Sequence, residues 1–306
     1  MTDRCRWMYN IPGNPGLHDI VIPGTHDSAT FNRADGNYDK CQDKTIYQQL
    51  CMGIRFVDIR LRWFINTSAP AGAPPSELGN FTIYHGGTWQ SVYFDGGSWI
   101  SPNDPGMANF PLQDAMRFLQ EYPSETVIMQ IKQEYSDNAA EKVGFAQAFK
   151  DLITRNDPLG TKFYVGTSVP TMADARSRIV IVNRDGALGS GYGIKWSWPD
   201  ADRGIDSPGY LYVEDNYADT TSAAKEANIK RGLDRAIHRP ASDTTWVVTF
   251  VSCAPGNDSP AAWAKDMNPY VAGYVRSEGT GSKFGTVVMD FPPDDLVGLL
   301  LTQYTT

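Results

Sequence analysis

The sequence has few cysteines, few histidines and no long apolar run. No segment approaches the ~18 consecutive apolar residues of a membrane-spanning helix, so no such helix is expected. The 4 cysteines match no zinc-finger or zinc-ribbon spacing and include no CxxC pair, which argues against a structural zinc site. The sequence leaves open whether Cys5, Cys41, Cys51 and Cys253 form disulfides.

Basic residues are also fewer than acidic ones. The chain of 306 residues has 27 Lys and Arg against 35 Asp and Glu, which gives a net charge of −8. An acidic chain repels polyanions, and no run of basic residues offsets this, so nucleic acid is not an expected partner. With 41% hydrophobic residues the chain has enough apolar material for a sizeable core, unlike a disordered chain.

Short apolar runs bounded by turn residues predict eight strands, and most are apolar on consecutive positions, as in a buried parallel sheet. The expected strands cover residues 20–22, 56–61, 81–84, 126–131, 179–182, 210–213, 246–251 and 286–289. Apolar residues at helical spacing predict helices over 43–50, 112–121, 138–155, 222–238 and 294–301. In 138–155 the expected buried stripe is Val143, Ala146, Phe149 and Ile153.

This alternation predicts an α/β fold, a (β/α)₈ TIM-type barrel, which routinely exceeds 250 residues as one domain. The helical pattern fails over residues 66–80, which read as a Pro- and Gly-containing loop. The barrel is therefore expected to be irregular and incompletely closed. No repeat or linker divides the chain, so residues 1–306 are expected to form one domain.

Charged or titratable residues lie at one end of most of the predicted strands. In a parallel barrel the carboxyl ends of the strands form one rim, where active sites gather. Salt bridges scattered over the molecule are the alternative, and for any single residue that alternative stays open. The residues at this rim are His26, Asp27, Asp58, Arg60, His85, Lys132, Glu134, Arg184, Asp215, Tyr217 and Asp290.

Two of the 4 histidines, His26 and His85, belong to this rim. Paired imidazoles can serve as base and acid near neutral pH, and neighbouring Lys and Arg favour an anionic substrate such as a phosphate. No nucleophilic Ser or Cys motif is present. The pattern therefore indicates phosphodiester cleavage in which a hydroxyl of the substrate is the nucleophile.

Seven segments, in order along nearly the whole chain, resemble the bacterial phosphatidylinositol-specific phospholipases C. The segments are 22–30 (IPGTHDSAT), 53–60 (GIRFVDIR), 84–86 (YHG), 122–134 (YPSETVIMQIKQE), 177–184 (SRIVIVNR), 213–217 (VEDNY) and 285–290 (GTVVMD). The resemblance implies cleavage of phosphatidylinositol to diacylglycerol and inositol 1,2-cyclic phosphate, followed by slower hydrolysis of the cyclic ester.

The resemblance also implies roles for the two histidines. His26 would remove the proton from the inositol 2-hydroxyl, with Asp290 orienting and stabilising its ring. His85 would protonate the departing diacylglycerol oxygen, with Asp27 assisting it.

Further roles follow from the same resemblance. Arg60 would neutralise the phosphate, and Asp58 would hold this guanidinium. The inositol ring would be bound by five residues, with Tyr217 stacking on its face: Lys132, Glu134, Arg184, Asp215 and Tyr217.

Arg60 bears on the metal question. In the calcium-dependent relatives this position is an acidic ligand, and the residue after the first histidine is Asn. Here the positions hold Arg60 and Asp27. A guanidinium in the place of the cation predicts an enzyme that needs no Ca²⁺ and no other cofactor.

The aromatic residues of 88–101 suggest contact with a membrane surface: Trp89, Tyr93, Phe94 and Trp99. Trp and Tyr favour the bilayer interface, but these side chains could equally pack beneath a Gly-rich loop. The expected partner is phosphatidylinositol in a membrane, touched peripherally by a monomer. The first residues lack the apolar core of a secretory signal, and secretion is expected from the resemblance alone.

Other functions stay open at this point. One is a barrel phosphodiesterase of the glycerophosphodiester type, which would ordinarily need a carboxylate metal site where Arg60 stands. Another is a non-catalytic module that binds inositol lipids, although both rim histidines are present. The sequence does not show whether phosphorylated inositol rings or glycosylphosphatidylinositol anchors are accepted.

Overall fold

A largely parallel sheet forms the centre of the computed structural model, which describes residues 3–34, 38–69, 73, 78–96, 109–199, 204–256 and 258–304. The strands follow the order β6–β7–β5–β2–β1–β12–β11–β10–β9, and β8 also pairs with β7. The parallel strands are β1 (Ile22–Thr25), β2 (Phe56–Ile65), β5 (Val127–Gln133), β6 (Phe163–Tyr164), β7 (Ile179–Arg184), β8 (Ile194–Trp196), β10 (Leu211–Glu214), β11 (Trp246–Phe250) and β12 (Thr286–Met289). The short β9 (Ile205–Ser207) pairs antiparallel with β10.

The barrel is open on one side. The β6 and β8 strands share the edge of β7 opposite β5, and in the described residues neither pairs with β9 or β10. The α/β class and the irregular, incompletely closed barrel are therefore confirmed. The strands are built from consecutive buried apolar residues, as in positions 179–182 of β7, because helices cover the outer face and side chains fill the interior.

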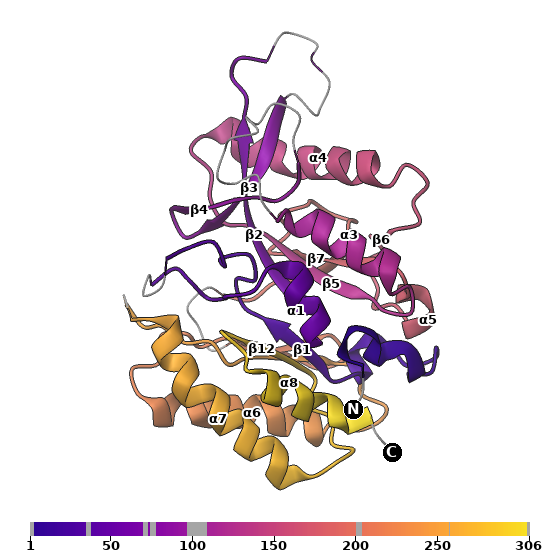
Figure 1. Cartoon of the computed structure of the whole chain (residues 1–306), viewed down its shortest axis with the longest axis vertical. Helices are drawn as coiled ribbons and strands as arrows, with labels where there is room; N and C mark the ends of the chain where they lie inside the picture. Colours follow the sequence, from indigo (N-terminus) through magenta and orange to yellow (C-terminus); the bar gives the residue numbers. More distant parts are fainter. Residues whose placement is uncertain are drawn as a thin grey trace.

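The third predicted strand differs from the expectation. The β3 strand (Gly79–His85) was expected as a parallel barrel strand, but it pairs antiparallel with the far half of β2 and with β4 (Thr88–Tyr93). The strands β2, β3 and β4 thus extend beyond the barrel as an arm, visible at the top of Figure 1. The 13 residues between β2 and β3, 66–78, include three prolines, which suits a return along β2 better than a long helical crossover.

Local signals fix the helix ends. Helix α1 (Ile46–Met52) begins with a capping box between Thr45 and Gln48 and ends at Gly53, which has a φ of +118°. Pro111 opens α3 (Pro111–Glu121). Side-chain caps from Asn138, Thr171 and Thr221 begin the next helices: α4 (Ala139–Asn156), α5 (Met172–Ala175) and α6 (Ser222–Ile237).

The helices pack on the two halves of the sheet (Figure 1). Helix α6 lies on β10 and β11 and against α7 (Pro260–Glu278), which in turn packs against α8 (Asp294–Leu301), while α4 lies on β2. One apolar core extends from Trp7 in the 3₁₀ helix η1 (Arg4–Asn10) to Leu301. Two further 3₁₀ helices are η2 (Leu17–Asp19) and η4 (Thr302–Tyr304).

Two helical features depart from the sequence expectation. The sequence does not predict α7, because Pro269 lies in its middle and proline normally breaks a helix interior. In α4 the expected stripe is wrong at Val143, whose side chain is 82% exposed, while Phe145 and Leu152 are buried instead. The buried face is therefore rotated from the predicted one.

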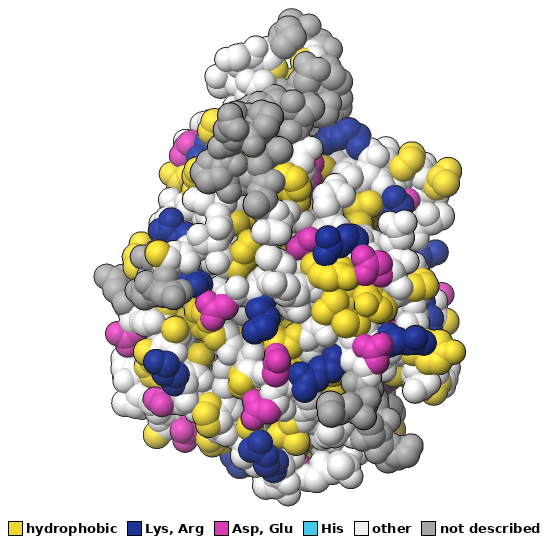
Figure 2. Space-filling view, in the orientation of Figure 1, with side chains coloured by type: hydrophobic (Ala, Val, Ile, Leu, Met, Phe, Trp, Pro, Cys, Tyr) yellow, Lys and Arg dark blue, Asp and Glu magenta, His cyan; other side chains and the backbone are white. Residues whose placement is uncertain are grey.

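The surface carries mixed charge. Figure 2 shows basic and acidic side chains interspersed over the visible face, without a large patch of one sign. None of the helices among the described residues has the length and apolar character needed to cross a bilayer. The face seen in Figure 2 thus offers no extended basic surface for a polyanion.

Candidate active site

The carboxyl ends of the parallel strands surround a cavity of about 260 Å³. Nine of the eleven predicted site residues line it: His26, Arg60, His85, Lys132, Glu134, Arg184, Asp215, Tyr217 and Asp290. The other two, Asp27 and Asp58, are 0% exposed and contact the lining residues from behind. The fold therefore brings the whole predicted set together.

His26 and Asp290 form the first histidine–carboxylate pair. Strand β1 runs parallel to β12 with Thr25 beside Met289, so the residues that follow these two strands emerge side by side. Nδ1 of His26 lies 2.9 Å from Oδ1 of Asp290. Gln42 donates from Nε2 to the carbonyl oxygens of both His26 and Met289, which fixes the two strand ends relative to each other.

His85 and Asp27 form the second pair. Nδ1 of His85 lies 2.8 Å from Oδ2 of Asp27. Asp27 has a φ of +42°, a left-handed conformation that Asp tolerates better than most residues. Burial lowers the pKa of His85, but the neighbouring Asp27 carboxylate outweighs burial, and the net pKa is raised. A histidine with a raised pKa keeps its proton at higher pH, as a proton donor requires.

The two imidazoles lie close together in the wall of the cavity. Their ring centroids are 6.3 Å apart, and their planes are nearly perpendicular, at 85°. Since Nδ1 of each ring is directed at a carboxylate, Nε2 of each ring is the atom left to exchange a proton with a bound molecule. One ring can therefore take a proton while the other gives one.

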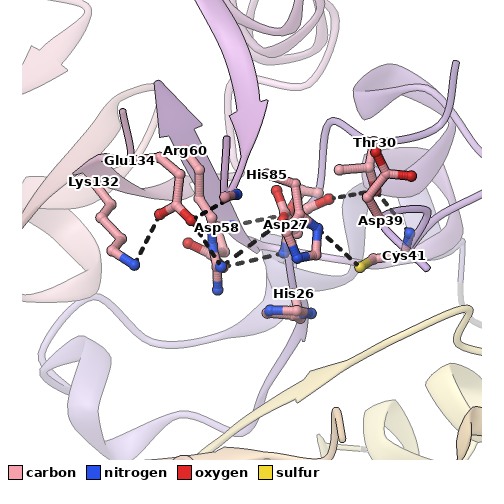
Figure 3. Close-up of polar contacts among 12 residues, drawn as sticks. His26, Asp27, Thr30, Asp39, Cys41, Asp58, Arg60, His85, Lys132 and Glu134 are labelled. Carbon is pink, nitrogen blue, oxygen red and sulfur yellow. Dashed lines mark hydrogen bonds and ion pairs between the residues drawn. The ribbon is translucent and has the colours of Figure 1, made fainter. Parts of the chain in front are cut away.

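Arg60 lies beside this pair, between several carboxylates (Figure 3). Its Nε lies 3.0 Å from Oδ2 of Asp58, and its Nη1 lies 3.9 Å from Asp27 and 3.8 Å from Glu134. Burial opposes this cation, but the carboxylates raise its pKa well above the ordinary value. The guanidinium is thus held in place and permanently charged.

Asp58 is the carboxylate that anchors Arg60. Its Oδ1 accepts a hydrogen bond of 2.7 Å from Nε2 of Gln130, and its Oδ2 accepts one from the backbone N–H of Asp27. Burial favours the neutral acid, but the Arg60 charge, the His26 ring and these hydrogen bonds outweigh it and lower the pKa of Asp58 to about 2. Asp58 is therefore ionised throughout the physiological range.

A ring of polar groups forms one wall of the cavity. Nζ of Lys132 lies 2.8 Å from Oε2 of Glu134, whose Oε1 accepts a hydrogen bond from the N–H of Gly86. Although burial opposes ionisation of Glu134, Arg60 and Lys132 lower its pKa. Alternating donors and acceptors of this kind suit a polyol.

The opposite wall is built on Trp198. The Arg184 guanidinium lies over the Trp198 ring, 3.3 Å from its centroid, and donates from Nη1 to the Trp198 carbonyl. Nε1 of Trp198 donates to Oδ2 of Asp215 at 2.8 Å. Burial raises the pKa of Asp215 and lowers that of Arg184. Tyr217 completes this wall.

Comparison with known proteins finds bacterial relatives that match most of this chain. A 1-phosphatidylinositol phosphodiesterase of Staphylococcus aureus (strain Newman) is 28% identical over 301 residues, which span 93% of this chain and 87% of that protein. The corresponding protein of Listeria monocytogenes is 24% identical over 94% of this chain and 81% of its own length. No protein-family model matches the sequence.

A solved structure agrees with these relatives. The phosphatidylinositol-specific phospholipase C of S. aureus, in a structure concerned with modulation of its membrane binding, superposes with a TM-score of 0.77 at 23% identity, covering 98% of this chain and 97% of that one. The chain is a homologue of the bacterial phosphatidylinositol-specific phospholipases C. The resemblance of the seven motifs to this family is thereby confirmed.

Several residues of this phospholipase C homologue's site escape the sequence reasoning. Gln130 lies two residues before Lys132 on β5, and the two-residue spacing on one strand face could have revealed it. Gln42 follows no strand, so no sequence signal points to it. Trp198 lines the cavity, whereas Trp196 is in the core.

The cysteines of the homologue are all free thiols in the structure. Cys41 is buried beside the site, and its Sγ lies 3.9 Å from Nδ1 of His85. Burial raises the pKa of this thiol well above its ordinary value, and the Asp290 and Asp27 carboxylates raise it further. The Sγ of Cys5 lies instead near the Cys51 carbonyl, away from the cavity.

The expected membrane-contacting aromatics of the phospholipase C homologue fall into three groups. Phe94 is a wrong prediction: its side chain is 0% exposed and stacks on Phe149 in the core. Trp89 and Tyr93 are half-buried, in edge contact with each other, and line a shallow groove on the arm together with Phe64. Trp99 lies outside the described residues.

Proposed function

We propose that the protein is a phosphatidylinositol-specific phospholipase C that cleaves phosphatidylinositol into diacylglycerol and inositol 1,2-cyclic phosphate. The observation that carries this proposal is the pair of neighbouring imidazoles, each backed by a buried or nearly buried carboxylate, with a fixed guanidinium beside them. Such an arrangement suits in-line transfer at phosphorus without a protein nucleophile.

His26 is the general base of the first step. Its Nε2 accepts the proton of the inositol 2-hydroxyl, whose oxygen then forms the new bond to phosphorus. Asp290, 2.9 Å from Nδ1, fixes the ring orientation and stabilises the imidazolium that results, as the carboxylate of a triad does.

His85 is the general acid of the same step. As the new oxygen–phosphorus bond forms, the bond from phosphorus to the glycerol oxygen breaks, and His85 protonates that oxygen. Asp27 holds the ring and favours its protonated form. By reversal of these roles His85 can activate water and His26 can supply a proton, which gives slower hydrolysis of the cyclic ester.

Arg60 stabilises the charge that develops on the phosphate oxygens. Because Asp58 and Gln130 fix the guanidinium before substrate arrives, little reorganisation is needed in the transition state. The same cation supports independence from Ca²⁺, because it supplies at this position the positive charge that a metal would otherwise bring.

The inositol ring binds between the two polar walls of the cavity. Lys132 and Glu134 contact hydroxyls on one side, and Arg184 and Asp215 contact them on the other, with Tyr217 stacked on the ring face. Support comes from their common cavity and from the alternation of donors and acceptors around it.

The enzyme meets its lipid at a membrane surface. The S. aureus protein is one whose membrane binding has been modulated, and the half-buried Trp89 and Tyr93 are the described aromatics suited to such contact here. Action outside the producing cell is proposed from the resemblance alone, and fractionating a culture of the source cells tests it.

A single experiment tests the reaction. The protein is incubated with phosphatidylinositol vesicles in excess chelator, and the products are followed by phosphorus NMR. A transient five-membered cyclic phosphate, replaced later by inositol 1-phosphate, is the expected result. Direct formation of an acyclic phosphate, or no turnover, would overturn the proposal.

A further inference from the structure

Cys41 lies where the two histidine–carboxylate pairs meet. It belongs to the segment between β1 and α1, is 0% exposed, and is fixed by a hydrogen bond from its backbone N–H to Oγ1 of Thr30. Figure 3 shows its sulfur beside the His85 ring, with His26 below that ring. The proposed acid–base chemistry makes no use of this thiol, so its position requires another explanation.

Metal-ligating atoms converge around this sulfur. One atom each from Asp27, Cys41 and His85 lie within 4.8 Å of one another, and the same is true of His26, Cys41 and Asp290. The two sets share Cys41. An ion held by either set would thus contact the Cys41 sulfur and one of the two histidines.

The spacing in the first set is close to that of a tetrahedral site. Around Zn²⁺, bonds of about 2.0 Å to nitrogen and 2.3 Å to sulfur place neighbouring ligand atoms roughly 3.3–3.6 Å apart. Here Sγ and Nδ1 are 3.9 Å apart, and Nδ1 and Oδ2 of Asp27 are 2.8 Å apart. These two distances lie within about 1 Å of the tetrahedral values, and the third is within the 4.8 Å limit of the set.

The Asp27 carboxylate gives an independent reason to place a cation here. Its Oδ1 is buried and accepts no hydrogen bond from any of the residues that the structure describes. A buried carboxylate oxygen without a donor is costly, and coordination of a cation would satisfy it.

The donor set selects the class of metal. Sulfur, imidazole nitrogen and carboxylate oxygen suit borderline and soft cations such as Zn²⁺ and Cd²⁺, whereas Ca²⁺ takes six to eight oxygen ligands. The Arg60 charge, 3.9 Å from Asp27, weakens binding of any cation. The Asp27 carboxylate, the Cys41 thiolate and the Asp290 carboxylate of the second set together supply a larger opposite charge. The thiol proton is released as the metal–sulfur bond forms.

We propose that Asp27, Cys41 and His85 form a binding site for a thiophilic divalent cation such as Zn²⁺, and that occupation of this site stops catalysis. The metal takes the Nδ1 lone pair of His85, so the ring cannot bind a second proton and form the imidazolium that acts as the acid. The binding part stands without the proposed function, and the inhibitory part rests on it.

Binding is tested with Cd²⁺ alone, on the purified full chain under reducing conditions. Ultraviolet absorption by charge transfer from thiolate to Cd²⁺ reports sulfur coordination directly. Cys5 and Cys51 lie close together, so the titration uses a Cys5→Ser/Cys51→Ser background, which leaves only Cys41 and Cys253. The expected result is one Cd²⁺ per chain, with the band lost in Cys41→Ser and kept in the matched control Cys253→Ser. A band that survives Cys41→Ser, or no band in the background protein, would overturn the site.

Inhibition is tested with Zn²⁺ in the vesicle assay. Cys41→Ser preserves the size of the side chain and is expected to turn over at a rate close to that of the wild type, but to need about ten-fold more Zn²⁺ or higher for half inhibition. Equal sensitivity of the two proteins would overturn the inhibitory part. If the protein cleaves no phosphatidylinositol at all, the proposed function fails, and the absorption titration still decides the metal site.

Discussion

His26 and Asp27 are consecutive residues, yet their side chains contact different elements: His26 pairs with Asp290 after β12, and Asp27 pairs with His85 at the end of β3. The left-handed backbone of Asp27 accompanies this divergence. One dipeptide therefore supports both imidazoles, and the distance between the two histidines depends on a single turn.

Removing either imidazole is expected to abolish turnover while the fold survives. His26→Ala and His85→Ala should each lower kcat by about 100-fold or more, the usual size of a general acid–base contribution. Both rings are partly exposed to the cavity, so circular dichroism and the melting temperature should change little. The exposed His238, at the end of α6, provides the control His238→Ala. A variant at His26 or His85 that retains more than about a tenth of the activity contradicts the acid–base roles.

Asp27→Asn is expected to shift the pH profile. The carboxylate raises the pKa of His85, so its loss lowers that pKa, and the proton needed for catalysis is lost at lower pH. The high-pH limb of kcat/KM should therefore move down by about one pH unit. Asp43→Asn, a change on an exposed carboxylate, should leave the limb in place. If Asp27→Asn lowers the rate equally at every pH, Asp27 only positions the ring.

Arg60 leads to a prediction about metals. Activity in excess chelator should equal activity without it, whereas Arg60→Ala should lower kcat by about 10²–10³-fold, as for other preorganised groups that stabilise developing charge. Arg60→Lys should fall between the two, because an ammonium cannot keep the fork geometry toward Asp58. Activity that disappears in chelator and returns only with Ca²⁺ would contradict this reading.

Ionisation of Asp58 is expected to make the free energy of unfolding depend on pH. Its pKa is about 2 in the folded protein, below the ordinary value of 3.8, so ionised Asp58 stabilises the fold above about pH 4. This contribution, about 2 kcal/mol, is lost as the pH falls toward 2. Urea unfolding at a series of pH values should show Asp58→Asn less stable than wild type at pH 7, with the gap narrowing on acidification. A constant gap would show that ionisation of Asp58 is irrelevant to stability.

Substitutions of the arm aromatics should have two kinds of effect, one on the stability of the fold and one on vesicle binding. Phe94→Ala removes a fully buried ring and is expected to cost about 3–5 kcal/mol of unfolding free energy, with little change in vesicle affinity of the folded fraction. Trp89→Ala, at a half-buried position, should weaken binding to neutral vesicles at high salt while changing the melting temperature little. Unchanged vesicle binding by Trp89→Ala would remove the arm from the membrane contact.

Much of the site could be predicted because its residues follow strands. Asp58 and Arg60 alternate on one strand face, and Asp290 directly follows a buried strand, so the parallel barrel places them at one rim. His85 reaches the same rim for a different reason, since its strand descends antiparallel from the arm. The position was therefore predicted correctly from a wrong pairing.

What sequence could not supply is the set of residues that support the site from irregular or unexpected elements. Gln42 and Cys41 lie between strand and helix, where no periodicity operates. Asn268, which donates to the Asp290 carbonyl, belongs to α7, the helix that the sequence does not predict because Pro269 lies inside it. Such contacts depend on tertiary packing rather than on local pattern.

The arm formed by β2, β3 and β4 divides the proposed machinery into two mechanical units. His26, Asp290 and the groups proposed to bind the inositol ring lie on the barrel rim, whereas His85 lies at the end of β3, which among the described residues pairs with β2 and β4 alone. In the proposed mechanism the barrel therefore recognises the headgroup, and protonation of the glycerol oxygen depends on a residue of the arm. A displaced arm would leave a protein that holds the inositol phosphate but cannot let the lipid go.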